Sequence, residues 1–209
     1  MKKDFRIIES VAFFGYSLAK EREAQYKAAY DIAKYMGQSG RLVVNGGGPG
    51  IMYAATKGAK DGGGEVSVVY YEPKFAQRFE GKSGINIADK HEKEANYILR
   101  TKRLLDLADA YIVFNGGTGT MSEFAMAWGV ARLYFGHHKP LILYGKSWKP
   151  LIEAFRKHTK IRDEAFRVYK IATTPKEAID HLEGLEERLH KHTLFHHKIC
   201  EDDECKLYL

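Results

Sequence analysis

The stretch Phe114-Asn115-Gly116-Gly117-Thr118-Gly119-Thr120-Met121-Ser122-Glu123 decides the fold. Before it, residues 109–114 are apolar and rich in β-branched and aromatic side chains, which predicts a buried strand. After it, residues 124–131 predict a mostly buried helix. A strand, a glycine loop and a helix direct backbone N–H groups and the positive end of the helix toward one place. That arrangement favours an anion, most often a phosphate.

Glu123 follows this loop by about one helical turn, and it has two interpretations. It can be a carboxylate held beside the anion site for chemistry. Thr120 and Glu123 also fit a capping box, in which Thr120 is the N-cap and Glu123 bonds back to the Thr120 N–H. This segment alone leaves both interpretations open.

Strands and helices alternate along the rest of the chain. The pattern predicts an α/β fold, a single-domain Rossmann-like parallel sheet of about six strands with helices on both faces. We assign residues 1–185 to this domain and residues 186–209 to a tail that contains His and Cys. Residues 73–89 predict a loop that covers the site. The other predicted strands are residues 11–15, 41–45, 65–70, 141–144 and 168–171, and the predicted helices are residues 21–36, 51–60, 90–108 and 148–157 and a last one that starts at Thr174.

Two further segments rich in glycine or small residues follow predicted strands. They are Gly15-Tyr16-Ser17 and Gly46-Gly47-Gly48-Pro49-Gly50-Ile51-Met52. Because the carboxyl ends of parallel strands meet at one edge of a sheet, we expect these segments and the central loop to form one binding site. The candidate binding residues are Gly15, Tyr16, Ser17, Gly46, Gly47, Gly48, Gly50, Met52, Gly116, Gly117, Thr118, Gly119 and Thr120.

Composition restricts the class of protein. The formal net charge of +6 comes from basic residues scattered among 27 acidic ones, so nucleic-acid binding is a minor alternative. No apolar run has membrane-spanning length and no signal peptide is evident, so we expect a cytoplasmic protein without membrane attachment. Cys200 and Cys205 form no disulfide framework, and metal binding by the tail is a weaker interpretation than a solvated or partner-contacting tail. Neither glycine loop has the G-x-G-x-x-G spacing of dehydrogenases, and Pro140 replaces a glycine that a P-loop requires.

The two loops resemble the motifs of the lonely-guy family of nucleotide phosphoribohydrolases, in the SLOG-type Rossmann superfamily. The family has G-G-G-x-x-G-x-M after its second strand and P-G-G-x-G-T-x-x-E after its fourth. This chain has residues 46–52, one residue tighter, and residues 115–123, with Asn115 in place of the proline. Arg100 stands where the family carries an arginine on the preceding helix, and Thr101 replaces the lysine that commonly follows it.

The resemblance implies an enzyme that hydrolyses the N-glycosidic bond of a nucleoside 5′-monophosphate to free base and ribose 5-phosphate. It implies Arg100 and Glu123 as the catalytic pair, no metal or other cofactor, and a homodimer. Relatives with this fold also bind a nucleotide or the molybdenum cofactor without cleaving it, so a carrier or sensor is the alternative function. A relative that binds single-stranded DNA gives a third and weaker one.

Overall fold

The computed structural model describes residues 7–72, 87–135 and 137–196, with only the backbone described for residues 188–196. Its centre is one sheet in which every pair of neighbouring strands is parallel. The described residues form seven strands in the order β4-β3-β2-β1-β5-β6-β7. The predicted parallel α/β sheet is therefore confirmed. The strands are β1 (Ser10–Phe14), β2 (Leu42–Asn45), β3 (Val66–Tyr70), β4 (Lys90–Lys93), β5 (Ala110–Phe114), β6 (Leu141–Tyr144) and β7 (Tyr169–Ala172).

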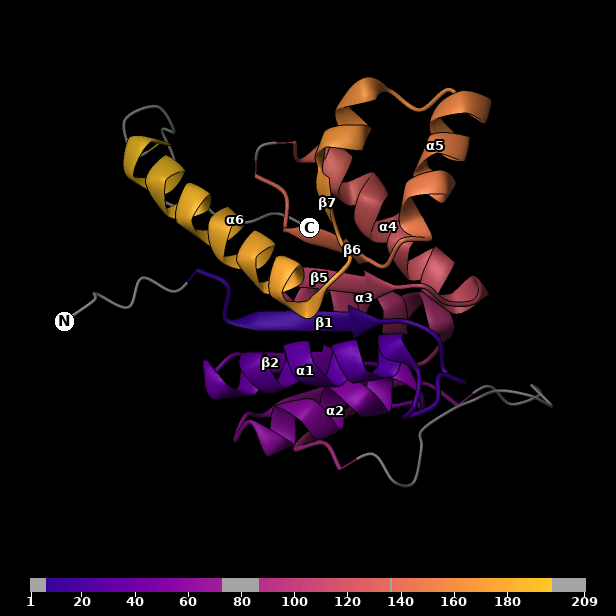
Figure 1. Cartoon of the computed structure of the whole chain (residues 1–209), viewed down its shortest axis with the longest axis vertical. Helices are drawn as coiled ribbons and strands as arrows, with labels where there is room; N and C mark the ends of the chain where they lie inside the picture. Colours follow the sequence, from indigo (N-terminus) through magenta and orange to yellow (C-terminus); the bar gives the residue numbers. More distant parts are fainter. Residues whose placement is uncertain (1–6, 73–86, 136, 197–209) are drawn as a thin grey trace.

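Helices cover both faces of this sheet (Figure 1). One apolar core joins the sheet to α1 (Ala24–Gln38), α2 (Ile51–Asp61) and α6 (Pro175–His196). A second core joins the other face to three more helices and to the short 3₁₀ helix Asp163–Arg167. The three helices of the second face are α3 (Tyr97–Leu107), α4 (Thr118–Leu133) and α5 (Trp148–His158).

Strand β1 shows why the sheet is buried on both sides. All five of its residues are buried, and the four apolar ones contribute alternately to the two cores. Val11 and Phe13 belong to the core under α1 and α2, whereas Ala12 and Phe14 belong to the core under α3 and α4. Alternate side chains of a strand point to opposite faces, so a continuous apolar run indicates a sheet covered twice.

The prediction of a single helix over residues 90–108 is wrong in its first part. Lys90–Lys93 is strand β4, which pairs with β3 at the edge of the sheet and has mostly exposed side chains. Charged side chains are typical of edge strands, and a run of them lacks the apolar alternation by which a strand is recognised in a sequence. The helix α3 begins only at Tyr97, because the Asn96 side chain accepts a hydrogen bond from the Leu99 N–H at 2.9 Å and caps it.

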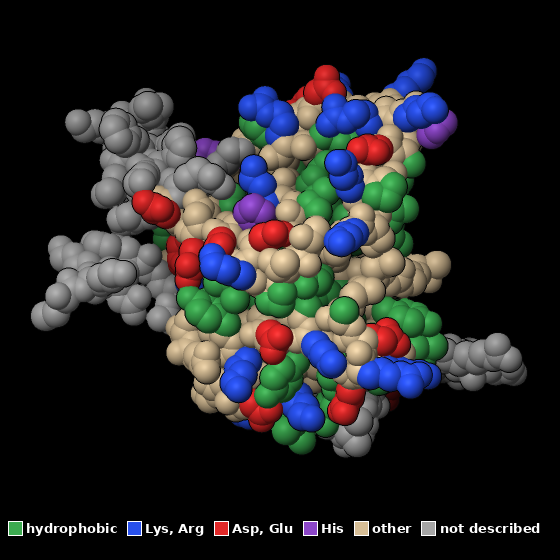
Figure 2. Space-filling model, in the orientation of Figure 1, with side chains coloured by type: hydrophobic (Ala, Val, Ile, Leu, Met, Phe, Trp, Pro, Cys, Tyr) green, Lys and Arg blue, Asp and Glu red, His purple; other side chains and the backbone are tan. Residues whose placement is uncertain are grey.

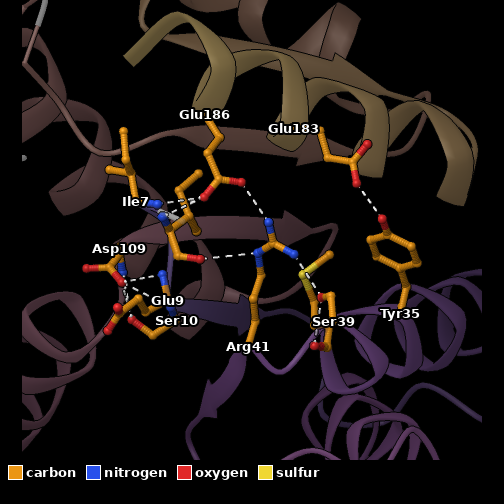
Figure 3. A network of polar contacts seen from close by, with 11 residues as sticks. Ile7, Glu9, Ser10, Tyr35, Ser39, Arg41, Asp109, Glu183 and Glu186 are labelled. Atoms are coloured by element: carbon orange, nitrogen blue, oxygen red, sulfur yellow. Dashed lines mark hydrogen bonds and ion pairs between the residues drawn. The ribbon is translucent and has the colours of Figure 1, made fainter. Parts of the chain in front are cut away.

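Helix α6 crosses the expected limit of the domain at residue 185 and continues to His196. Glu186, the first residue past that limit, accepts hydrogen bonds from the N–H groups of Ile7 and Ile8, at 2.8 and 2.9 Å (Figure 3). Its second carboxylate oxygen lies 2.6 Å from Nη2 of Arg41. We call this contact between α6, residues 7–8 and Arg41 the Glu186 clamp. The tail cysteines, Cys200 and Cys205, lie outside the described residues.

The surface carries charges of both signs. On the face shown in Figure 2, Lys and Arg side chains are interspersed with Asp and Glu, and no continuous basic area covers it. Among the helices that the structure describes, none has both the length and the apolar character needed to span a membrane.

Candidate functional site

The site lies where the chain reverses its course through the sheet. From β1 the chain proceeds outward through β2, β3 and β4, and it then returns to add β5, β6 and β7 on the other side of β1. In open α/β sheets, the carboxyl ends of the strands beside such a switch point form a crevice that binds ligands. Here the crevice is a cavity of about 580 Å³. It is lined by Gly15, Tyr16, Ser17, Gly46, Gly48, Met52, Tyr70, Tyr71, Tyr97, Arg100, Gly117, Thr118, Gly119, Thr120, Ser122 and Glu123.

Most of the residues that the sequence predicts for the site line this cavity together. Gly47, Gly50 and Gly116 do not line it. Gly50 has a φ of +66°, and a Cβ there would lie 2.3 Å from the carbonyl oxygen of Tyr16. Gly50 therefore allows the second loop to cross closely over the first, which is a structural role.

A second, more polar hollow of about 730 Å³ lies at the opposite, amino-terminal edge of the sheet. Several of its polar side chains already have partners. Asp109 accepts hydrogen bonds from the N–H and the hydroxyl of Ser10, and Lys90 lies 3.3 Å from Glu65. Because these groups satisfy one another, we assign the functional site to the cavity at the carboxyl edge, although it is the smaller of the two.

The first turn of α4 is open toward the cavity. The helix begins at Thr118, with Gly117 as its N-cap, and no side chain caps it. The first turn contains no acidic residue. Backbone N–H groups in a first turn have no acceptor within the helix, so those of Thr118, Gly119 and Thr120 are available to an anion in the cavity.

The capping-box interpretation of Glu123 is wrong. The N-cap is Gly117 rather than Thr120, so Glu123 lies beyond the first turn of α4. Its carboxylate instead accepts a hydrogen bond from Arg100, with 2.5 Å between Oε1 and Nη1. Both residues are buried in the cavity wall, with exposed fractions of 5% for Glu123 and 9% for Arg100.

Arg100 is held at three points. Its Nε donates to the carbonyl oxygen of Val69 at 3.2 Å, in addition to the bond from Nη1 to Glu123. The guanidinium also lies against Gly46, where a Cβ would come within 1.6 Å of Nη2. The absence of a side chain at residue 46 therefore gives Arg100 the room to reach Glu123.

Burial changes the acidity of Glu123. Removal of the carboxyl group from water raises its pKa above the ordinary value of 4.5, and the charge and hydrogen bond of Arg100 oppose that rise. A buried carboxyl with a raised pKa, paired with a cation inside a cavity, is typical of a functional group rather than of a surface ion pair. The pair can stabilise positive charge or exchange a proton with water.

The sequence analysis missed four residues of the cavity wall, namely Tyr70, Tyr71, Tyr97 and Ser122. The rings of Tyr71 and Tyr97 meet edge to face, with centroids 5.8 Å apart. Tyr70 ends β3 and Tyr71 follows it at the ligand-binding edge, and this position could have identified both. Tyr97 was hidden because the helix that contains it was predicted to start seven residues too early, at Lys90 instead of Tyr97.

Among the side chains that the structure describes, no three His, Cys, Asp or Glu residues lie together in a way that could hold a metal ion. The groups that line the cavity are backbone amides, the Arg100–Glu123 pair and the side chains of tyrosine, serine, threonine and methionine residues.

Comparison with known proteins gives the family. The model of the SLOG cluster4 family matches residues 9–173. A protein of Oryza sativa subsp. japonica, named "Probable cytokinin riboside 5′-monophosphate phosphoribohydrolase", is 28% identical over 182 residues, covering 82% of this chain and 70% of that protein. An "Uncharacterized protein" of Archaeoglobus fulgidus is 30% identical over 123 residues, covering 59% of this chain and 77% of that protein.

Solved structures share the fold. The molybdenum cofactor binding protein from Rippkaea orientalis has a TM-score of 0.61 and 22% sequence identity, and the match covers 84% of this chain and 94% of that one. The resemblance to the lonely-guy family is confirmed by the family model and by the rice relative. From its glycine loops, its sheet order and these matches together, the chain belongs to the SLOG cluster4 family.

Proposed function

We propose that the protein hydrolyses the N-glycosidic bond of a nucleoside 5′-monophosphate and releases the free base and ribose 5-phosphate. One observation carries this proposal: the buried Arg100–Glu123 pair lines the same cavity as the uncapped first turn of α4. A phosphate site and a buried carboxylate within one cavity are the two parts that such a reaction needs. The name of the rice relative supports the same reaction.

The 5′-phosphate binds to the N–H groups of residues 118–120, at the positive end of α4. This contact lies away from the bond that breaks. It positions the ribose through a group that does not react, and it contributes binding energy to the reaction. The ribose then lies between Gly15-Tyr16-Ser17 and the Gly46–Met52 loop, both of which contribute to the cavity wall.

Glu123 acts on the ribose carbon that carries the base. As the bond to the base breaks, its electron pair leaves with the base and positive charge develops on the ribose ring. The Glu123 carboxylate stabilises that charge or takes a proton from the water that attacks the same carbon. Arg100 holds Glu123 in position, the hydroxyl of the attacking water completes ribose 5-phosphate, and the proton of that water ends on the released base.

The test is a panel of purine and pyrimidine 5′-monophosphates assayed for free base and ribose 5-phosphate. We expect Glu123→Gln to lower turnover by about a thousandfold or more while nucleotide binding persists. Glu153→Gln, an exposed change on α5, is the matched control and should turn over like the wild type. Wild-type turnover in Glu123→Gln would contradict the assigned chemistry.

The alternative function is a carrier that binds a nucleotide-containing ligand without cleaving it. The structural relative from Rippkaea orientalis is named as a molybdenum cofactor binding protein, although at 22% identity the likeness speaks for the fold alone. The same panel separates the two functions. Tight binding of a nucleotide without release of any base would favour the carrier.

A homodimer is the assembly we propose. Helix α4 has exposed apolar or small residues at helical spacing on its outer side, namely Ala125, Met126, Gly129 and Leu133. The charged residues of α4 are Glu123 and Arg132. Because Glu123 is buried, the outer side of the helix carries no charge before Arg132. An uncharged apolar surface can meet its own copy without repulsion. Light scattering should give twice the chain mass, and Met126→Lys should give monomers.

A further inference from the structure

Two hydroxyl groups of the cavity wall, those of Tyr97 and Ser122, have no part in the chemistry described above. Both lie at the carbonyl group of Gly119 in the first turn of α4. The Tyr97 hydroxyl donates to this carbonyl at 3.1 Å, and the Ser122 hydroxyl lies 2.8 Å from the same oxygen. The two hydroxyl oxygens are 2.5 Å from each other. They form a closed triangle around one backbone carbonyl.

The triangle contains two protons for three contacts. If Tyr97 donates to the Gly119 carbonyl, Ser122 can donate to Tyr97. If Tyr97 donates to Ser122, Ser122 donates to the carbonyl. In both arrangements the Gly119 carbonyl accepts one hydroxyl hydrogen bond, in addition to the backbone hydrogen bond that α4 provides, and the other hydroxyl donates to the first. Loss of either hydroxyl therefore leaves the other able to bond to Gly119.

This carbonyl controls an amide that faces the cavity. The Gly119 carbonyl and the Thr120 N–H belong to the same planar peptide unit and point in opposite directions. The Thr120 N–H is one of the first-turn donors that have no acceptor within the helix. Fixing the carbonyl toward Tyr97 and Ser122 therefore fixes the N–H toward the anion site.

The turn needs such support because packing gives it little. Apart from the chain neighbours of Gly117, no described heavy atom lies within 4 Å of the position a Cβ would take there, and at Gly119 the described neighbour outside the nearby helix backbone is the Tyr97 hydroxyl, at 3.5 Å. Glycine also restricts the backbone less than other residues do. The peptide planes of this turn are therefore held by the hydrogen bonds of α4 itself and, at Gly119, by the two hydroxyl groups.

We propose that Tyr97 and Ser122 are positioning residues that hold the peptide between Gly119 and Thr120 so that its N–H donates to the 5′-phosphate of the substrate. The inference rests on the proposed function, in which that phosphate binds to the first turn of α4. Tyr97 comes from α3, the helix of Arg100, and its ring centroid lies 5.8 Å from Cζ of Arg100. One residue thus connects the phosphate site to the helix that carries the cation of the catalytic pair.

The experiment is a double-mutant cycle on the full chain with Tyr97→Phe, Ser122→Ala and both changes together. Dissociation constants for ribose 5-phosphate, a nucleoside 5′-monophosphate and the same nucleoside without phosphate are measured by calorimetry, and kcat is measured at saturating substrate. Tyr30→Phe is the matched control. It removes one tyrosine hydroxyl bond, to Asp61, on the other face of the sheet.

We expect each single variant to bind ribose 5-phosphate within about twofold of the wild type and the double variant to bind it about tenfold more weakly, the loss of one hydrogen bond. Binding of the unphosphorylated nucleoside should stay within about twofold in all variants, because the phosphate contact alone is weakened, and any fall in kcat should be confined to the double variant. A role limited to stability would instead weaken both ligands alike.

Two outcomes would overturn the inference in distinguishable ways. If the wild type binds ribose 5-phosphate and the double variant binds it equally well, the positioning role is wrong and the proposed function stands. If the wild type binds neither ribose 5-phosphate nor any nucleotide, both the proposed function and the inference are wrong. Additive single effects, with no excess loss in the double variant, would contradict the shared triangle.

Discussion

The Arg100 guanidinium and the Glu123 carboxylate meet at 2.5 Å, although they belong to different helices and lie 23 positions apart in the chain. Their meeting follows from the parallel sheet. Helices α3 and α4 pack on the same face and both begin near the carboxyl edge, so early residues of each point to one cavity. The relationship predicts that the two residues act as a unit.

The first prediction concerns Arg100→Lys. Lysine keeps the positive charge but lacks the planar fork that lets Arg100 bond to Val69 and Glu123 at once. We expect kcat to fall by about a hundredfold and the affinity for nucleotide to change much less. Steady-state kinetics measure both quantities. Arg103→Lys, on the same helix but paired with Glu92 near the surface, is the control and should keep wild-type kcat.

The second prediction is the pH dependence of turnover. Burial raises the pKa of Glu123, so its carboxyl takes up a proton at a higher pH than an ordinary glutamate. Both roles proposed for Glu123 need the ionised form. As the pH falls through this raised pKa, kcat should therefore fall, and the acid limb should lie above pH 4.5, the ordinary value. An acid limb at or below that value would argue against Glu123 as the titrating group.

The third prediction is that Gly117→Asp makes the protein more stable and weakens its binding of nucleotide. This N-cap residue has φ −82° and ψ −162°, a conformation that aspartate adopts readily. In Gly117→Asp the new carboxylate caps α4 and occupies the place of the phosphate. The cap should raise the melting temperature by about 1 °C, since aspartate at an N-cap is more stabilising than glycine by only a few tenths of a kcal/mol.

The same variant should bind a nucleoside monophosphate at least about tenfold more weakly, because its carboxylate repels the phosphate. Gly117→Ala adds no cap and meets no heavy atom within 4 Å. This control should bind nucleotide nearly as the wild type does and should not gain stability. Calorimetry of binding and thermal unfolding provide the two readouts. A stabilised Gly117→Asp that still binds nucleotide fully would place the phosphate elsewhere.

The fourth prediction concerns the Glu186 clamp. Glu186→Ala leaves the Arg41 guanidinium buried without its carboxylate partner, since the two side chains are 12% and 8% exposed. Loss of one partner of a buried ion pair costs about 3 kcal/mol or more of unfolding free energy. Urea unfolding measures this loss. Glu183→Ala removes an exposed partner of Tyr35 on the same helix and should cost about 1 kcal/mol or less.

Much of the fold could be predicted because its signals are local. The apolar runs before Gly46 and Gly116 are strands, and glycine loops at parallel strand ends converge on one edge. Strand β4 could not be predicted in this way. Its sequence, Lys-His-Glu-Lys, has no apolar alternation, because an edge strand with exposed side chains is specified by its backbone pairing to β3.

The site could be predicted in its loops but not in its walls. Gly117 to Thr120 and Glu123 lie within one continuous segment, so their shared location follows from the chain itself. Tyr97 reaches Gly119 from another helix, and that contact depends on where α3 begins. Gly50 and Gly116 have the sequence pattern of ligand-binding glycines, yet they lie outside the cavity lining. A Cβ at Gly50 would meet the Tyr16 carbonyl, and a Cβ at Gly116 would meet the Thr120 side chain, so both are needed for close packing.

The Glu186 clamp also has a consequence for the order of folding. Its carboxylate bonds to Ile7, which precedes it by 179 positions, so the clamp is among the most non-local contacts a chain of this length can make. Ribosomal synthesis delivers residue 7 long before residue 186. During that interval β1 can pair with β2, although the Glu186 carboxylate that pairs with Arg41 has not yet been synthesised. Contacts with such long sequence separation slow folding, and closing this one should belong to the latest steps, after the sheet has formed.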